Sequence, residues 1–157
     1  MAGVTRYRVL YEHMPAAVAV GGVFWWLDGN PAHIAIALAF GWLVDADHLC
    51  DYLIWAWLSQ QRLAVRDFLG GRYFAESGKV IVPLHGFEWC LALAGSSLLL
   101  PESTVLMALT AAIALAVHLL QDQWTYRPAR AGYFLTARLI HRFDQAWFCR
   151  QLTHDVR

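Results

Sequence analysis

The sequence predicts an all-α integral membrane protein: a four-helix up-down bundle followed by a C-terminal amphipathic helix at the membrane interface. Hydrophobic residues make up 59% of the 157 residues and charged residues only 15%, which is too apolar for an ordinary soluble domain of this size. The apolar residues also gather into stretches near the about 20 residues that a helix needs to cross a bilayer. These stretches are residues 9–27, 32–58, 80–100 and 103–124. We therefore expect one membrane-embedded domain over residues 1–157.

The first stretch, residues 9–27, follows Arg6 and Arg8 and so resembles a signal peptide. It lacks the small-residue pattern of a cleavage site, however, and it ends in the pair Trp25 and Trp26. Tryptophan is enriched where a helix meets the membrane interface. We interpret this stretch as a retained span.

The connections between the stretches predict the order of the helices. Residues 28–31 and 101–102 are very short turns, which force neighbouring helices to run antiparallel. Residues 59–79 form the one long connection, and the Gly70–Gly71 pair within it favours a loop with a short amphipathic piece. An up-down bundle follows, with residues 59–79 as a candidate lid.

The charges predict the orientation of the bundle. The short turns carry Asp28 and Glu102, whereas basic residues precede the first stretch, fill the long connection and follow the fourth stretch. By the positive-inside rule, both termini lie in the cytoplasm and the chain is a multi-pass protein of the inner (cytoplasmic) membrane. The basic residues are Arg6, Arg8, Arg62, Arg66, Arg72, Lys79, Arg127, Arg130, Arg138, Arg142, Arg150 and Arg157.

The same charge pattern predicts the partners. The formal net charge is zero, so the basic side should meet anionic lipid headgroups rather than nucleic acid, and the sequence shows no nucleic-acid-binding module. Membrane lipid is the expected partner. A membrane-protein partner or a homo-oligomer is also compatible with this composition.

Residues 133–152, after the fourth stretch, predict an amphipathic helix in the inner interface. Its apolar residues share one face at helical spacing, and its polar residues lie opposite. The apolar set is Leu135, Leu139, Phe143, Ala146 and Trp147, and the polar set is Arg138, Arg142 and Gln145.

Three clusters of ionisable residues interrupt the apolar stretches. An ionisable side chain within a membrane helix costs about 2.5 to 3.5 kcal/mol on insertion scales, so such groups seldom persist without a partner or a task. Helical spacing brings Asp47, His48 and Asp51 within an arc of about 100°, with Asp45 further round, and it brings the pair in each of the other two clusters to one face. All three clusters reach the cytoplasmic side of the bundle. They are Asp45, Asp47, His48 and Asp51 in the second stretch, His85 and Glu88 in the third, and His118 and Asp122 in the fourth, with His13 placed to join them.

Helices that deliver His and carboxylate pairs to one layer are typical of metal sites in helical bundles. Mixed nitrogen and oxygen ligands suit Zn²⁺, Mn²⁺ or Fe²⁺, and the absence of thiolate partners argues against a structural zinc site. The number of ligands allows one or two divalent ions. A two-metal site commonly polarises a phosphoryl oxygen and supplies hydroxide near neutral pH.

Two other interpretations of the clusters stay open: a purely structural polar network, and a pathway for protons or ions. Three histidines fall outside the clusters. We interpret His33 and His154 as bystanders because they lie near the outer face and the C-terminus, whereas His141 on the amphipathic helix could be a further ligand.

The order of these motifs resembles the YdjM-like family of predicted membrane-bound metal-dependent hydrolases of bacteria and archaea. The stretch Asp45-Ala46-Asp47-His48 resembles the DxDH motif of the family, residues 118–122 resemble its HxxxD motif, and His13 resembles the His of its first helix. The third motif departs from the family pattern HRGxTHS, because Glu88 stands where a second His is usual. The proline that precedes DxDH is also absent, with Val44 in its place. The resemblance extends from His13 to about Phe143 and implies a metal site more firmly than a substrate.

Together these observations favour a membrane-bound metallohydrolase that acts on a lipid or lipid-linked phosphoester at the cytoplasmic leaflet. Asp51 or Glu88 could serve as general base. Arg127, Arg138 and Arg142 are candidate phosphate clamps, because guanidinium groups bind phosphate in a bidentate way, but membrane orientation and lipid contact would also account for them. The alternative function is a non-enzymatic small membrane subunit, whose polar or metal cluster holds its helices and which packs against a larger complex. A lipid phosphatase with a His nucleophile is disfavoured, because the chain has neither a PSGH motif nor an SR dipeptide ahead of His118.

Overall fold

The computed structural model describes residues 8–149, with side chains from residue 12 onward. It is mostly helical and has no strand within those residues, which confirms the all-α prediction. The 3₁₀ helix η1 spans Leu43–Asp47. The α-helices are α1 (Arg8–Asp28), α2 (Ala32–Gly41), α3 (His48–Leu58), α4 (Val65–Gly70), α5 (Arg72–Ser77), α6 (Phe87–Ser96), α7 (Glu102–Tyr126), α8 (Leu135–Ile140) and α9 (Gln145–Phe148). Arg6, Arg150, His154, Arg157 and the last residues of the predicted interfacial helix lie outside the described residues.

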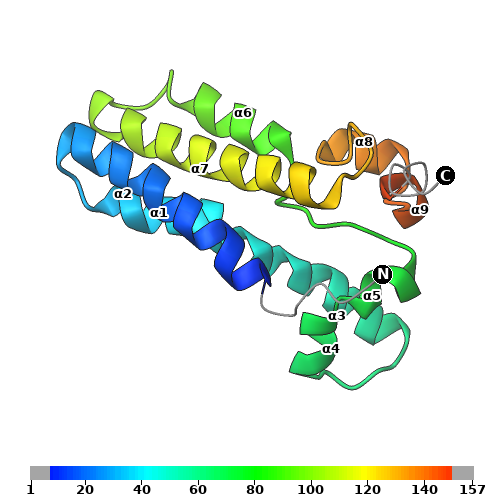
Figure 1. Cartoon of the computed structure of the whole chain (residues 1–157). Coiled ribbons are helices and arrows are strands. Elements are labelled where there is room, and N and C mark those ends of the chain that lie inside the picture. The colour runs from blue at the N-terminus through cyan, green and yellow to red at the C-terminus, as the bar shows by residue number, and fades with distance from the viewer. Residues whose placement is uncertain (1–7, 150–157) are drawn as a thin grey trace.

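Helices α1, α2, α6 and α7 lie side by side and form the body of the molecule (Figure 1). Small residues allow α1 and α2 to approach closely. A Cβ atom on Gly21 of α1 would lie only 2.7 Å from the Cα atom of Ile34 in α2. Helix α7 contacts α1, α2 and α6, so it is the central helix of this group.

Of the helices that the structure describes, α7 alone is long and apolar enough by itself to cross a membrane. Helix α2 and residues 43–58 pass the same test only when counted together, as one span bent by 44°. The prediction of four spans therefore stays a prediction.

The predicted second span, residues 32–58, is broken in the structure. Helix α2 ends at Trp42, whose φ of −137° and ψ of −53° leave the helical region, and η1 then leads into α3. A 3₁₀ stretch within a helix often marks a functional site or strain. The break lets η1 carry Asp45 and Asp47 at the end of the helical body, where α7 also ends (Figure 1).

The predicted third span, residues 80–100, is helical only within α6 (Phe87–Ser96), because residues 80–86 run in a non-helical path back from α5. Side chains bind the backbone of this connection in place of helical hydrogen bonds. Asp51 accepts from the backbone N–H of Ile81 and Val82 at 2.7 and 2.8 Å, and Asp47 accepts from that of Leu84 at 2.7 Å. His85 is thus held on a fixed connection rather than on a helix.

The predicted interfacial helix, residues 133–152, is divided within its described part into α8 and α9. The chain turns between them at Arg142 and Phe143, whose φ angles are +53° and +57°. The prediction that Arg138 lies on a polar outer face was wrong, because Arg138 is only 1% exposed. Its guanidinium group donates to the carbonyl oxygens of Ile81, Val82 and His85, so it binds the connection from the other side.

Candidate metal centre

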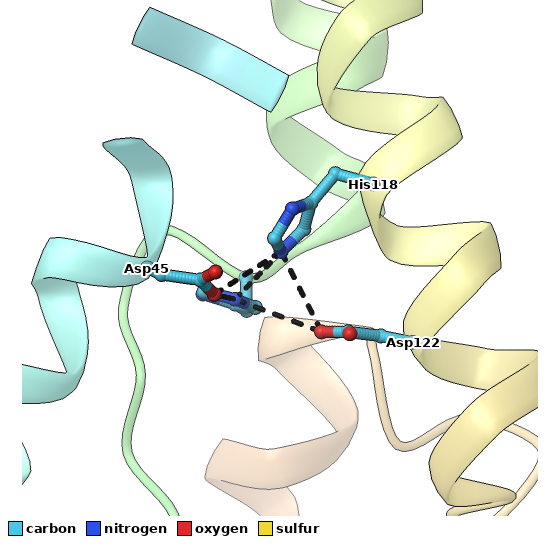
Figure 2. A group of neighbouring side chains, drawn as sticks. Asp45, His118 and Asp122 are labelled. Carbon is cyan, nitrogen blue, oxygen red and sulfur yellow. Dashed lines mark hydrogen bonds and ion pairs between the residues drawn. The ribbon is translucent and has the colours of Figure 1, made fainter. Parts of the chain in front are cut away.

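Four side chains converge at the end of α7 where η1 and the connection before α6 meet it. Asp45 comes from η1, His85 from the connection, and His118 and Asp122 from α7. Figure 2 shows Asp45 and Asp122 on either side of the ring of His118. Each residue offers one ligand atom within 4.8 Å of the ligand atoms of the others. We name this set the inner cluster.

The ligand atoms of the inner cluster lie close together. The Nε2 atoms of His85 and His118 are 3.0 Å apart. Asp45 Oδ1 lies 3.2 Å from the first of these atoms and 3.4 Å from the second. Asp122 Oδ2 lies 3.8 Å from Nε2 of His85 and 3.5 Å from Nε2 of His118.

These separations fit the edges of a small coordination polyhedron. Ligand atoms at the usual zinc bond lengths of about 2.0 to 2.1 Å stand about 3.3 Å apart at the corners of a tetrahedron. The five separations, from 3.0 to 3.8 Å, scatter around that length. The inner cluster therefore has dimensions suited to one divalent cation.

The other ring nitrogen of each histidine faces an acceptor. Nδ1 of His118 lies 3.2 Å from the carbonyl oxygen of Gly41, and Nδ1 of His85 lies 3.0 Å from Asp47 Oδ1. A neutral histidine carries one ring proton, and the hydrogen bond to Gly41 favours its placement on Nδ1 of His118. The Nε2 lone pair of His118 then points into the inner cluster, as in metal-binding histidines whose second nitrogen is held by an outer oxygen. Nδ1 of His85 faces Asp47 without a hydrogen bond.

His13 of α1 supports the inner cluster from outside. Its Nε2 atom lies 3.1 Å from Asp122 Oδ1, the carboxylate oxygen that faces away from the cluster. Its Nδ1 atom lies 3.1 Å from Gln121 Oε1, and its ring centroid is 4.1 Å from that of His118. His13, predicted as a ligand, thus lies in the position of a residue that orients Asp122.

Asp47 and His48 lie next to the inner cluster. One ligand atom from each, together with one nitrogen of His85, forms a second group within 4.8 Å. His48 Nε2 also lies 3.6 Å from Asp45 Oδ1. The side chain of His48 is 28% exposed and that of Asp45 is 14% exposed, so the cluster is open to its surroundings on this side.

Asp51 and Glu88, the candidate general bases and metal ligands, make other contacts. Both carboxylate oxygens of Asp51 accept from the backbone of Ile81 and Val82. Glu88 accepts from the backbone N–H groups of Leu135 and Thr136, at 2.9 Å each, and so caps the start of α8. The structure gives both carboxylates a part in holding the backbone around the cluster.

The three candidate phosphate clamps do not form one group. Arg138 is buried, and its guanidinium group donates to the backbone carbonyls named above. Arg127 ends α7 with an exposed side chain, and Arg142 is exposed in the turn before α9. His141 stacks on Trp147, with ring centroids 4.0 Å apart.

Sequence reasoning missed two contributors to the site. The carbonyl of Gly41 gives no signal in a sequence, because any residue could supply it. Tyr133 is buried with its ring centroid 6.4 Å from that of His85. Burial and the nearby charge of Asp122 raise the pKa of Tyr133 well above its usual value, which makes it a neutral phenol. An aromatic residue eleven positions after Asp122 carries no spacing that would have revealed it.

Comparisons with known protein families, with curated proteins and with solved structures find no match for this chain.

Proposed function

We propose that this chain is a membrane-bound metal-dependent hydrolase that acts on a lipid or lipid-linked phosphoester at the cytoplasmic leaflet. The observation that carries the proposal is the convergence of two imidazole nitrogens and two carboxylate oxygens in the inner cluster. Four electron-pair donors that face one another repel unless a cation or shared protons lie between them. Mixed imidazole and carboxylate ligands at these separations suit a divalent cation.

The outer surface of the helices supports a membrane setting. Many large apolar side chains are exposed on the bundle helices, whereas soluble monomers rarely expose a contiguous apolar surface of that kind. Trp26 at the end of α1 is 84% exposed, Leu99 in the turn before α7 is 90% exposed, and Trp124 near the end of α7 is 82% exposed. Tryptophan at both ends of the helices fits the aromatic belts of membrane proteins.

A phosphoester substrate is supported by the charges near the inner cluster. Basic residues occur in the segment from α3 to α6 and after α7, which lie at the same end of the molecule as the inner cluster (Figure 1). They would attract a phosphate group to that end. A cation bound in the inner cluster would polarise a phosphoryl oxygen and lower the pKa of a bound water.

The resemblance to the YdjM-like hydrolases agrees with this proposal. Asp45 of the DxDH motif meets both His118 and Asp122 of the HxxxD motif in the inner cluster. These are the motif residues expected to act together in that family. The resemblance therefore supports a shared metal chemistry, while the substrate rests on the charge and membrane arguments.

One observation favours the alternative, a non-enzymatic membrane subunit. Asp51, Glu88 and Arg138 all hold backbone groups, so much of the polar network serves to fix the fold. A subunit of this kind would keep its metal or polar cluster but would show no turnover. Turnover therefore separates the two functions.

Phosphate release from phospholipid substrates in detergent micelles tests the proposal. We expect the metal-loaded protein to release phosphate or a phosphorylated headgroup, and we expect a chelator or the change His118→Ala to abolish that release. His141→Ala is the matched control, because it removes another histidine of the same end without touching the inner cluster. Equal release by wild type and His118→Ala would contradict a metallohydrolase, and metal binding without any turnover would favour the subunit.

A further inference from the structure

The inner cluster supplies four protein ligands, which is the number that fills a tetrahedral zinc site. Catalytic metal sites usually keep one position open for water or substrate. A hydrolase built on the inner cluster alone would lack that position. An open coordination position would then have to come from a second cation beside the cluster.

Three unpartnered atoms lie beside the inner cluster. In the part of the chain that the structure describes, four buried side-chain atoms lack a hydrogen bond, and three of them are Asp45 Oδ2, Asp47 Oδ1 and Nδ1 of His85. Asp47 is 5% exposed and His85 is 1% exposed. Buried polar atoms are nearly always satisfied in folded proteins, so three such atoms on adjacent side chains need an explanation.

The contact between His85 and Asp47 does not remove this need. Nδ1 of His85 lies 3.0 Å from Asp47 Oδ1, but off the line of a hydrogen bond. Even with a proton on that nitrogen, Oδ1 keeps a lone pair free, because a carboxylate oxygen accepts more than one partner. The other oxygen of Asp47 is fixed by the backbone N–H of Leu84 at 2.7 Å, which orients Oδ1.

His48 completes the set. Its ring belongs to the same group as Asp47 and His85, and it meets the ring of His85 edge-on with centroids 5.0 Å apart. Its Nε2 atom lies 3.6 Å from Asp45 Oδ1, and its side chain is the most exposed of the set, at 28%. An ion beside His48 would thus face the open side of the cluster.

From this geometry, and resting on the proposed function for the inner cluster, we propose a second cation site formed by Asp45 Oδ2, Asp47 Oδ1 and the ring of His48. The two ions would share the Asp45 carboxylate, because its Oδ1 lies in the inner cluster and its Oδ2 is buried without a partner. We name this second set the outer site. Carboxylate bridges of this kind join the ions of di-iron and di-manganese bundles.

The chemistry of the outer site differs from that of the inner cluster. Two carboxylates and one imidazole suit Mn²⁺, and three protein ligands leave positions open for a phosphoryl oxygen and a water. Two-metal sites stabilise the attacking and leaving oxygens of a phosphoryl displacement in this way. The inner ion would then anchor the Asp45 bridge, and the outer ion would meet the substrate.

Reconstitution of the metal-free, full-length protein with Mn²⁺ tests the outer site. We expect wild type to retain two Mn²⁺ per chain and to give the electron paramagnetic resonance spectrum of a coupled pair. His48→Ala should retain one Mn²⁺ with an uncoupled spectrum. Asp47→Asn, which keeps an acceptor for the N–H of Leu84, should do the same, and His141→Ala should match wild type.

The outcomes separate the two proposals. One Mn²⁺ in wild type, unchanged by His48→Ala and Asp47→Asn, would overturn the outer site and leave the inner cluster standing. Two Mn²⁺ in both variants would also overturn it. No bound Mn²⁺ in any folded variant would remove the outer site, and the absence of Zn²⁺ as well would remove the inner cluster on which it rests.

Discussion

Two buried histidine clusters occupy opposite ends of the helical body, and they differ in the hydrogen-bond partners of their ring nitrogens. At the end that carries the short turns, Nδ1 of His33 lies 2.6 Å from Thr110 Oγ1 and Nε2 lies 2.9 Å from Asp28 Oδ2. Each nitrogen of this fully buried ring therefore has its own partner. At the other end, Nε2 of His85 faces Nε2 of His118 at 3.0 Å, and two carboxylates share the same space.

Burial alone therefore does not identify a functional histidine. His33 and His118 are equally hidden, at 0% and 1% exposure. A hydroxyl and a carboxylate satisfy His33 without any added group. In the inner cluster, two ring nitrogens and two carboxylate oxygens face one another, and one bound cation would satisfy all four.

The largest expected effect comes from removing an inner ligand. His118→Ala should lower the affinity for Zn²⁺ by more than about 100-fold, because even outer residues that hold a ligand commonly contribute 10- to 100-fold. His33→Gln should leave the affinity unchanged, since His33 has no part in the inner cluster. Isothermal titration of the metal-free proteins measures both. An equal loss in the two variants would break the distinction between the clusters.

Metal removal should destabilise the protein mainly through the inner cluster, which also anchors the Asp45 carboxylate. A ligand present at 100 times its Kd stabilises the folded state by about 2.7 kcal/mol. A chelator should therefore lower the melting temperature of wild type and of His33→Gln by more than that of His118→Ala. Thermal unfolding followed by circular dichroism in detergent checks this, and an equal shift in all three proteins would contradict the inner cluster as the main cation site.

A smaller effect is expected from His13, which orients Asp122 rather than binding the cation. His13→Ala should weaken Zn²⁺ binding by about 10- to 100-fold while leaving one Zn²⁺ bound at saturation. The measurement is a competition titration against a chromophoric chelator. A complete loss of Zn²⁺ would instead place His13 among the ligands.

The smallest effect concerns the His33 cluster and pH. The hydrogen bond from His33, together with that from the backbone of Asn30, lowers the pKa of Asp28 below its ordinary value of 3.8. A lowered folded-state pKa contributes stability above the unfolded pKa, and that stability is lost as the pH falls through the folded value. Asp28→Asn should therefore weaken the loss of stability below about pH 4. Acid titration of the melting temperature would show this, and an unchanged acid profile would contradict the pairing.

Helical spacing predicted part of the inner cluster. His118 and Asp122, four residues apart on α7, do meet on one face, and Asp45 from another segment joins them. Spacing along one helix could not predict the roles of Asp51 and Glu88, because their partners are backbone groups distant in sequence. A carboxylate in an apolar segment must be stabilised by a metal ion or by hydrogen-bond donors. The spacing of residues along one helix does not show which of the two is present.

The burial of Arg138 follows from the connection that it binds. Residues 80–86 run without helical hydrogen bonds, so side chains from three other segments must bind their backbone. Amphipathic periodicity assigned Arg138 to the polar face because it reports the face of one helix and not the needs of a neighbouring chain segment. The sequence pattern therefore could not reveal hydrogen bonds between side chains and backbone groups that are far apart in the sequence.

Elemental analysis of the detergent-purified protein, without added metal, shows whether the inner cluster holds a cation. Wild type is compared with the double variant His85→Ala/His118→Ala and with His33→Gln. We expect a divalent transition metal near or above one equivalent in wild type and in His33→Gln, and at least one equivalent less in the double variant. Folded wild type that contains no such metal, and takes up none when Zn²⁺ or Mn²⁺ is supplied, would rule out a metal centre in the inner cluster.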